Sequence, residues 1–150
     1  MSRKTIIILC ILFFMPLVIY FLRPSDESRI KKLFRDGSQA IEKEDIDAVM
    51  SKVSFNYTDE YGLNYLYIKE SLKRVFQQMS DIKIEYENLK ITVSEKTAGA
   101  EMDVRVVATI GTETGYILGD LPNPVHLTFT LEKERTKWMV TKTGGMPFKW

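Results

Sequence analysis

The side chains best suited to chemistry lie close together in the first half of the chain. Asp59 and Glu60 stand between Tyr57 and Tyr61. Two carboxylates beside two phenols could supply the acid and the base of a proton transfer at the edge of a pocket. However, aspartate is also a common turn residue for backbone reasons alone, and Gly62 follows directly. We therefore favour a solvated turn before a helix and keep the acid–base pair as the alternative.

A tyrosine cluster surrounds the same turn. Tyrosine combines an apolar ring with a polar hydroxyl, so such a cluster either contacts a ligand or packs between a helix and a sheet. Packing is the favoured interpretation. For a ligand-binding site, the sequence predicts contacts from Tyr57, Asp59, Tyr61 and Tyr65. It identifies no catalytic residue.

The composition excludes several classes of function. The chain has 150 residues, which suits one domain. Its 21 Lys and Arg against 20 Asp and Glu give a net charge of +1, without the basic excess typical of nucleic-acid binding. Cys10 is the only cysteine and His126 the only histidine, which rules out a disulfide within the chain and the usual Cys/His zinc site. We expect no metal, no other cofactor and no nucleic-acid partner.

A long apolar segment dominates the N-terminus. Residues 5–22 carry no charge, and about 18 apolar residues approach the length that spans a bilayer. The bulky residues before Arg23 lack the small side chains of a cleavage site, so an uncleaved signal-anchor is favoured over a cleaved signal. Arg3 and Lys4 favour a cytoplasmic N-terminus, although basic residues after the span weaken this bias.

These features predict four segments. Residues 1–4 form a short cytoplasmic stub, 5–22 a single-pass transmembrane anchor, 23–25 a linker and 26–150 one domain. We expect this domain outside the cytoplasmic (inner) membrane of a bacterium, with the membrane as the partner of the anchor.

Three helices are expected after the linker. Ser25 can cap the first, Asp45 a shorter second and Asn64 a third, because these side chains accept hydrogen bonds from the free amides at a helix start. Residues 55–57 alternate as a short strand would. The apolar face of the third helix is predicted to hold Tyr65, Ile68, Leu72, Val75, Phe76 and Met79.

Strands are expected after Asp81, where the apolar period changes from about 3.6 residues to about 2. Apolar residues occupy even positions in the first half of the first strand and odd positions in its second half. An extra residue, and therefore a bulge, is expected near Asn88. Residues 112–123 are predicted as a loop and 134–137 as a hairpin turn. The inward side should hold Ile84, Leu89, Ile91, Met102, Val104, Val106, Leu127, Phe129, Leu131 and Val140. None of these side chains can act as an acid or a base. His126 lies on the outward side, where we favour a surface histidine over a pH-sensitive interface residue.

Helices first and strands afterwards predict an α+β fold. Three parts of the chain resemble one superfamily: residues 55–62 leading into 68–72, residues 84–93 followed by Ala98 and Ala100, and residues 137–141. Together they resemble the nuclear transport factor two-like superfamily, the cystatin-like cone. The resemblance covers about 120 residues, the size of one domain. It implies about three helices packed on a curved antiparallel sheet, with a conical pocket between them.

The resemblance leaves the function open, because the superfamily includes isomerases, dehydratases, transport adaptors and membrane-tethered assembly parts. Members similar to ketosteroid isomerase place an Asp base in the pocket. No inward position here matches it, so no catalytic residue is carried over. We therefore favour a membrane-tethered, non-catalytic binding or assembly domain, with room for a small ligand. The alternative is a small-molecule enzyme of the ketosteroid isomerase-like kind that uses Asp59 and a tyrosine.

The outer face of the sheet is a candidate surface for a protein partner. It is rich in threonine, and sheets of this superfamily often pair with a second copy. We expect either another protein or a homodimer partner there.

Overall fold

The computed structural model describes residues 3–22 and 24–147. The helices are α1 (Arg3–Leu22), α2 (Asp26–Glu42), α3 (Ile46–Met50) and α4 (Tyr65–Gln78). The strands are β1 (Ser80–Ser94), β2 (Thr97–Ile110), β3 (Glu113–Leu118), β4 (Val125–Glu134) and β5 (Lys137–Gly144). Residues 1–2 of the expected stub and Arg23 of the expected linker lie outside the described residues.

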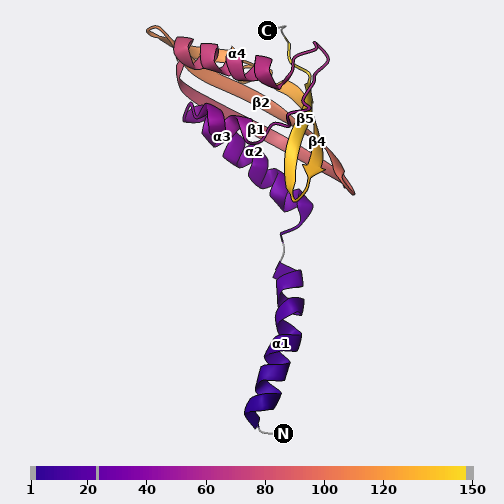
Figure 1. The fold of residues 1–150 in the computed structure, drawn as a ribbon. Coiled ribbons are helices and arrows are strands. Elements are labelled where there is room, and N and C mark those ends of the chain that lie inside the picture. Colours follow the sequence, from indigo (N-terminus) through magenta and orange to yellow (C-terminus); the bar gives the residue numbers. More distant parts are fainter. Residues whose placement is uncertain (1–2, 23, 148–150) are drawn as a thin grey trace.

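Helix α1 stands apart from the other elements (Figure 1). Its described apolar side chains are exposed, with Leu12 at 67% and Phe13 at 77%. Among the residues that the structure describes, no helix combines the length and the apolarity needed to cross a bilayer.

All three predicted helix caps are confirmed. The side chain of Ser25 accepts a hydrogen bond from the amide of Ser28, and that of Asp45 from the amide of Ala48. Asn64 does the same for the amide of Tyr67 at the start of α4. Each bond satisfies a backbone donor that the helix cannot satisfy itself, so the helices begin where the sequence places these residues.

The sheet is a five-stranded antiparallel structure in the order β1-β2-β4-β5, with β3 also paired to β2. The predicted bulge is confirmed, because the β1–β2 register shifts between Glu87 and Lys90 and Asn88 has a φ of 56°. The hairpin turn at residues 134–137 is confirmed as well, with Arg135 at a φ of 55° between β4 and β5.

Two expectations are wrong. The predicted loop at 112–123 contains β3, which pairs with the end of β2 from Ile110 to Val106. Gly111, Gly115 and Gly119 favour a loop there, but pairing with β2 overrides the weak strand propensity of the segment. The predicted strand at 55–57 is a turn instead, in which the amide of Tyr57 donates to the carbonyl of Ser54. Ser54 Oγ accepts from the amide of Asn56 and closes this turn locally.

The core lies between α2 and the inner face of the sheet. Ile30 of α2 and Leu131 of β4 are both fully buried. Phe34 of α2 packs edge-on against Phe129 of β4, with ring centroids 5.0 Å apart. Trp138 is buried in the same cluster. These contacts fix α2 firmly on one half of the sheet.

Helix α4 is held much more loosely. It lies along the sheet beyond α2 and α3 (Figure 1), and none of its residues is buried. An amphipathic helix usually gains its stability by burying its apolar face. Here that face meets open space instead, and this space is the site described next.

Candidate functional site

A cavity of about 450 Å³ lies between α4, one side of α2 and the inner face of the sheet. This volume falls in the range of small-molecule sites in proteins. The helical wall is formed by Ile68, Leu72, Val75, Phe76 and Met79. These are five of the six residues that the sequence assigns to the apolar face of this helix. The face is therefore correctly predicted, but it lines a cavity rather than a closed core.

The opposite wall comes from the sheet. It includes Ile84, Met102, Val104, Leu127 and Phe129, all predicted to point inward. Apart from the phenol of Tyr86, the side chains of this wall do not titrate, because the inward parity of each strand selects mainly apolar residues. The cavity therefore offers dispersion contacts and exclusion of water along most of its surface.

Polar groups gather where Tyr57, Asp59 and Thr143 join the lining. Tyr57 is only 5% exposed. Burial raises the pKa of its phenol, the hydrogen bond with Thr143 partly opposes this effect, and the negative charge of Asp59 raises the pKa further. The phenol therefore stays neutral over the physiological pH range and keeps its proton available for a hydrogen bond.

Asp59 organises the turn that the sequence predicts. Its Oδ1 accepts hydrogen bonds from the amide of Tyr61 at 2.9 Å and the amide of Leu63 at 2.8 Å. Gly62 completes the turn with a φ of 78°. The turn interpretation is confirmed, and the same carboxylate also lines the cavity. Asp59 therefore both stabilises the turn and contributes to the cavity wall.

The structure separates the four predicted ligand-contacting residues into two pairs. Tyr57 and Asp59 line the cavity, whereas Tyr61 and Tyr65 do not. The hydroxyl of Tyr61 donates to the carbonyl of Met146 at 3.2 Å. Tyr65 stacks on Phe55, with ring centroids 4.5 Å apart. Tyr61 and Tyr65 thus pack around the start of α4, in agreement with the packing interpretation of the tyrosine cluster.

Sequence reasoning missed Thr143 as a cavity residue. It lies near the end of β5, more than eighty positions from Tyr57, and no local pattern links the two. The alternation of side chains along β5 gives the one available signal. Val140 points inward, and the register shift opposite Thr130 and Leu131 changes the alternation, so that Thr143 falls on the inward side as well.

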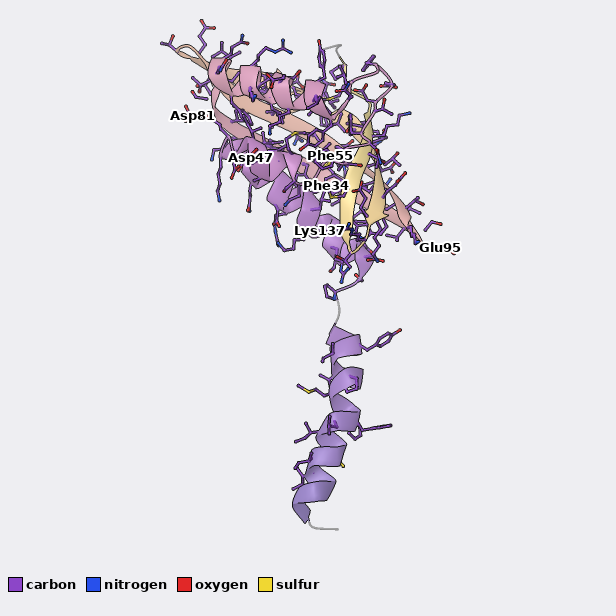
Figure 2. All side chains as sticks on the ribbon, viewed as in Figure 1. Phe34, Asp47, Phe55, Asp81, Glu95 and Lys137 are labelled. Carbon is purple, nitrogen blue, oxygen red and sulfur yellow. The ribbon has the colours of Figure 1, made fainter. Side chains whose placement is uncertain are left out.

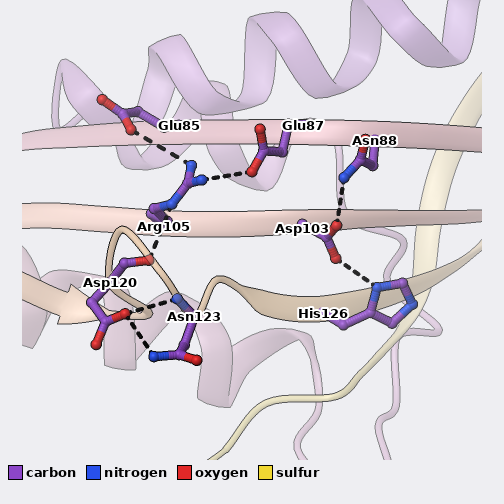
Figure 3. Close-up of polar contacts among 8 residues, drawn as sticks. All are labelled: Glu85, Glu87, Asn88, Asp103, Arg105, Asp120, Asn123 and His126. Atoms are coloured by element: carbon purple, nitrogen blue, oxygen red, sulfur yellow. Dashed lines mark hydrogen bonds and ion pairs between the residues drawn. The ribbon is translucent and has the colours of Figure 1, made fainter.

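The outer face of the sheet carries a separate polar network (Figure 3). Asp103 accepts a hydrogen bond from Asn88 and contacts Nδ1 of His126, both at 2.8 Å. The hydrogen bond with Asn88, and after it the contact with His126, hold the pKa of Asp103 below its usual range. His126 is exposed, in agreement with the predicted surface position. The network is solvated and lies on the face opposite the cavity.

Arg105 forms a second polar cluster on this face (Figure 3). Its guanidinium lies 2.6 Å from Glu87 and 3.9 Å from Glu85, and it donates to the carbonyl of Asp120. Its side chain is only 14% exposed. Among the described residues, no group of three or more His, Cys, Asp or Glu side chains is arranged to hold a metal ion.

Comparison with known proteins identifies related sequences and folds. The sequence pattern of the SnoaL-like domain matches residues 30–145. No curated protein sequence matches the chain.

Solved structures match the fold at low sequence identity. A conserved protein from Planctomyces limnophilus has a TM-score of 0.68 at 14% identity, over 81% of this chain and 94% of that one. A provisionally named aromatic ring hydroxylase from Novosphingobium aromaticivorans has a TM-score of 0.67 at 20% identity, over 81% and 89% of the two chains. A Nostoc punctiforme protein of unknown function with a cystatin-like fold has a TM-score of 0.58 at 11% identity, over 81% and 92%. The predicted cystatin-like α+β cone is therefore confirmed.

Proposed function

The chain belongs to the SnoaL-like domain family, and from this premise we propose that it is a membrane-tethered, non-catalytic domain that binds an apolar small molecule. The observation that carries this proposal is the cavity of about 450 Å³ beneath α4, whose walls are almost wholly apolar. Apolar surface that is left open in a folded domain is stabilised when a ligand removes it from water.

The chemistry of the lining supports binding without catalysis. An acid–base enzyme needs a titratable group aimed at the reacting atoms. The sheet wall offers the phenol of Tyr86 and otherwise apolar side chains, and the Asp59 carboxylate already accepts hydrogen bonds from two backbone amides. Tyr57 is a neutral donor rather than a base. These groups suit recognition of a polar head on an otherwise apolar ligand.

The tether is proposed from the sequence of residues 5–22 taken as a whole, which has no charged side chain. The exposed apolar side chains along α1 support it, because such a surface is stabilised by lipid. Alkaline carbonate should leave the full chain in the membrane fraction, and mass spectrometry should find an N-terminus before residue 5. Release by carbonate, or a mature chain that begins after Leu22, would contradict the tether.

An enzyme remains the second candidate, because Tyr57 and Asp59 both line the same end of the cavity. In that case Asp59 would be the base and Tyr57 the hydrogen-bond donor to the substrate. Asp59→Asn should then abolish turnover of any compound recovered from the cavity, whereas a binding domain shows no turnover before or after the substitution.

The binding proposal is tested with two tryptophan variants of α4. Leu72 lines the cavity, whereas Leu66 of the same helix is 71% exposed and lies outside the lining. Organic extraction and mass spectrometry of the purified full chain should recover an apolar compound from the wild type and Leu66→Trp. Leu72→Trp fills the cavity and should lose it. Lipid held on α1 is common to all three proteins, so equal recovery from them would contradict the proposal.

A further inference from the structure

We propose that the cavity selects one extended aliphatic chain that ends in a non-anionic hydrogen-bond donor, such as a hydroxyl group. This inference rests on the binding function proposed above. It follows from three properties of the cavity: its length, the position of its polar groups and the sign of the charge among them.

The cavity follows α4 from its first turn to its end. Ile68 and Met79 both line it, and eleven residues of helix rise by roughly 16 Å. Tyr57 lies at the start of α4, since the neighbouring Thr58 forms a β-bridge with Asn64. Ile82 lies at the other end, where α4 leads into β1. An extended chain can therefore run along α4 from Tyr57 to Ile82.

The two ends of the helix are well separated. Figure 2 shows Phe55, which stacks on Tyr65 at the start of α4, and Asp81, which follows its end, in different parts of the domain. The far end is lined by Val75, Met79 and Ile82, which are apolar. The ligand therefore has one polar end, placed beside Tyr57, and one apolar end.

Tyr86 of β1 adds a phenol to the sheet wall, where it neighbours Leu89 and the first half of α2. Three further polar residues of the lining bond within their own segments. Ser38 donates to the carbonyl of Arg35 at 2.9 Å, and Lys52 Nζ donates to the hydroxyl of Ser51 at 3.3 Å. Ser71 Oγ accepts from Arg74 at 3.3 Å. We assign the polar head of a ligand to the group of Tyr57, Asp59 and Thr143, which combines a carboxylate with two hydroxyls.

Lys52 also brings a charge to the lining, but its Nζ is bonded to Ser51, whereas the charge of Asp59 acts on the Tyr57 phenol. The charge beside Tyr57 therefore selects against an anionic head. Asp59 brings a carboxylate, and Tyr57 beside it stays neutral. A carboxylate accepts more than two hydrogen bonds, so Asp59 can accept one from a ligand beyond those from its backbone donors. A hydroxyl head can donate to Asp59 and accept from Tyr57, and a bond to a charged acceptor is strong. A fatty-acid carboxylate would instead meet a like charge in a water-poor site.

The test uses two probes that differ only in their heads. Dodecanol and dodecanoic acid, each with a photoreactive diazirine at the end of the chain away from its head, are added to the detergent-solubilised full chain at neutral pH. Peptide mapping should find the alcohol attached near Met79 and Ile82. Labelling by the acid should be about tenfold weaker, which corresponds to 1.4 kcal/mol.

Asp59→Asn removes the negative charge of the site and leaves its shape nearly unchanged. The amide oxygen can still accept from the backbone donors of the turn, so the fold should persist, as checked by circular dichroism. In this variant, labelling by the acid should rise to within about threefold of labelling by the alcohol. Equal labelling by the two probes in the wild type, or an alcohol diazirine attached near Tyr57 and Thr143, would overturn the inference but leave the binding function standing.

Failure of the binding function has a different signature. In that case both probes would label α1 alone, and Leu72→Trp would not reduce labelling of either. If the binding function holds, Leu72→Trp removes the cavity labelling by both probes and Leu66→Trp retains it.

Discussion

The indole Nε1 of Trp138 donates a hydrogen bond of 3.1 Å to the carboxylate of Asp26. Lys133 Nζ lies 2.8 Å from the same carboxylate. Asp26 opens α2, whereas Lys133 and Trp138 flank the hairpin between β4 and β5. One side chain therefore ties the first helix of the domain to the last hairpin of the sheet.

Asp26→Ala should destabilise the domain by roughly 1–3 kcal/mol, because it leaves the buried Trp138 donor without its acceptor and Lys133 without its counter-charge. Chemical denaturation of the full chain followed by circular dichroism measures the change. Glu27→Ala is the matched control, since its partner Lys31 is 55% exposed and such surface pairs contribute little. A loss no larger than that of the control would contradict the role of Asp26.

Stability should also fall in acid through Asp26. Its hydrogen bond with Lys133, followed by that with Trp138, lowers its pKa below the unfolded value. The folded protein therefore binds fewer protons than the unfolded chain as pH falls. The contribution of ionised Asp26 to the free energy of unfolding is complete above the unfolded pKa of about 4. It is lost as the pH falls through the lower pKa of Asp26 in the folded protein. In Asp26→Asn, the denaturation midpoint should change less steeply below pH 4 than in the wild type. Parallel acid profiles would contradict this prediction.

Much of the fold was predictable from local sequence. The caps at Ser25, Asp45 and Asn64 depend on bonds made within four residues, and strand parity depends on a period of about two. The bulge at Asn88 follows from the same parity. Strand β3 was missed because its pairing with β2 decides its structure, and its own residues do not.

The site was predictable only in part. Tyr57 and Asp59 were found because phenol and carboxylate stand together in the sequence. Thr143 was not, since it reaches them only because residues 53–58 bond along β5 in the folded chain. The superfamily resemblance implies a pocket, but the residue pattern itself carries no signal for an open cavity. An apolar helix face looks the same in sequence whether it meets a packed core or an empty space.

Glycine at position 145 should be required for the turn after β5. Its φ is 84°, and a Cβ atom there would collide with the backbone carbonyl of His126. Gly145→Ala should therefore destabilise the domain by roughly 1–3 kcal/mol, through strain and displacement of the chain. Gly99→Ala is the control, because a Cβ on Gly99 has nothing within 4 Å and its φ is ordinary. Thermal unfolding of both variants compares them, and equal midpoints would refute the steric argument.

Because α4 is loosely attached, two leucine-to-alanine substitutions should lower the free energy of unfolding by unequal amounts. Leu131→Ala removes a fully buried side chain and should cost roughly 2–5 kcal/mol. Leu72→Ala shortens a side chain that faces the cavity and has few packing partners to lose, so it should cost less than about 1 kcal/mol in the ligand-free protein. Urea denaturation of the delipidated full chain gives both values. A large loss for Leu72→Ala would mean that α4 is packed closely against the sheet.

Tyr57→Phe should separate recognition of the ligand head from the shape of the cavity. The ring remains, so the apolar walls and the buried volume are nearly unchanged, but the phenol no longer bonds Thr143 or a ligand hydroxyl. We expect a stability loss of about 1 kcal/mol. Photolabelling by the dodecanol probe should fall about fivefold, since a donor to the head is lost while the chain contacts persist. The Asp59 carboxylate still opposes the acid, so labelling by dodecanoic acid should change little. A uniform loss for both probes would instead mean that the substitution alters the walls, and the phenol would then have no part in selecting the head.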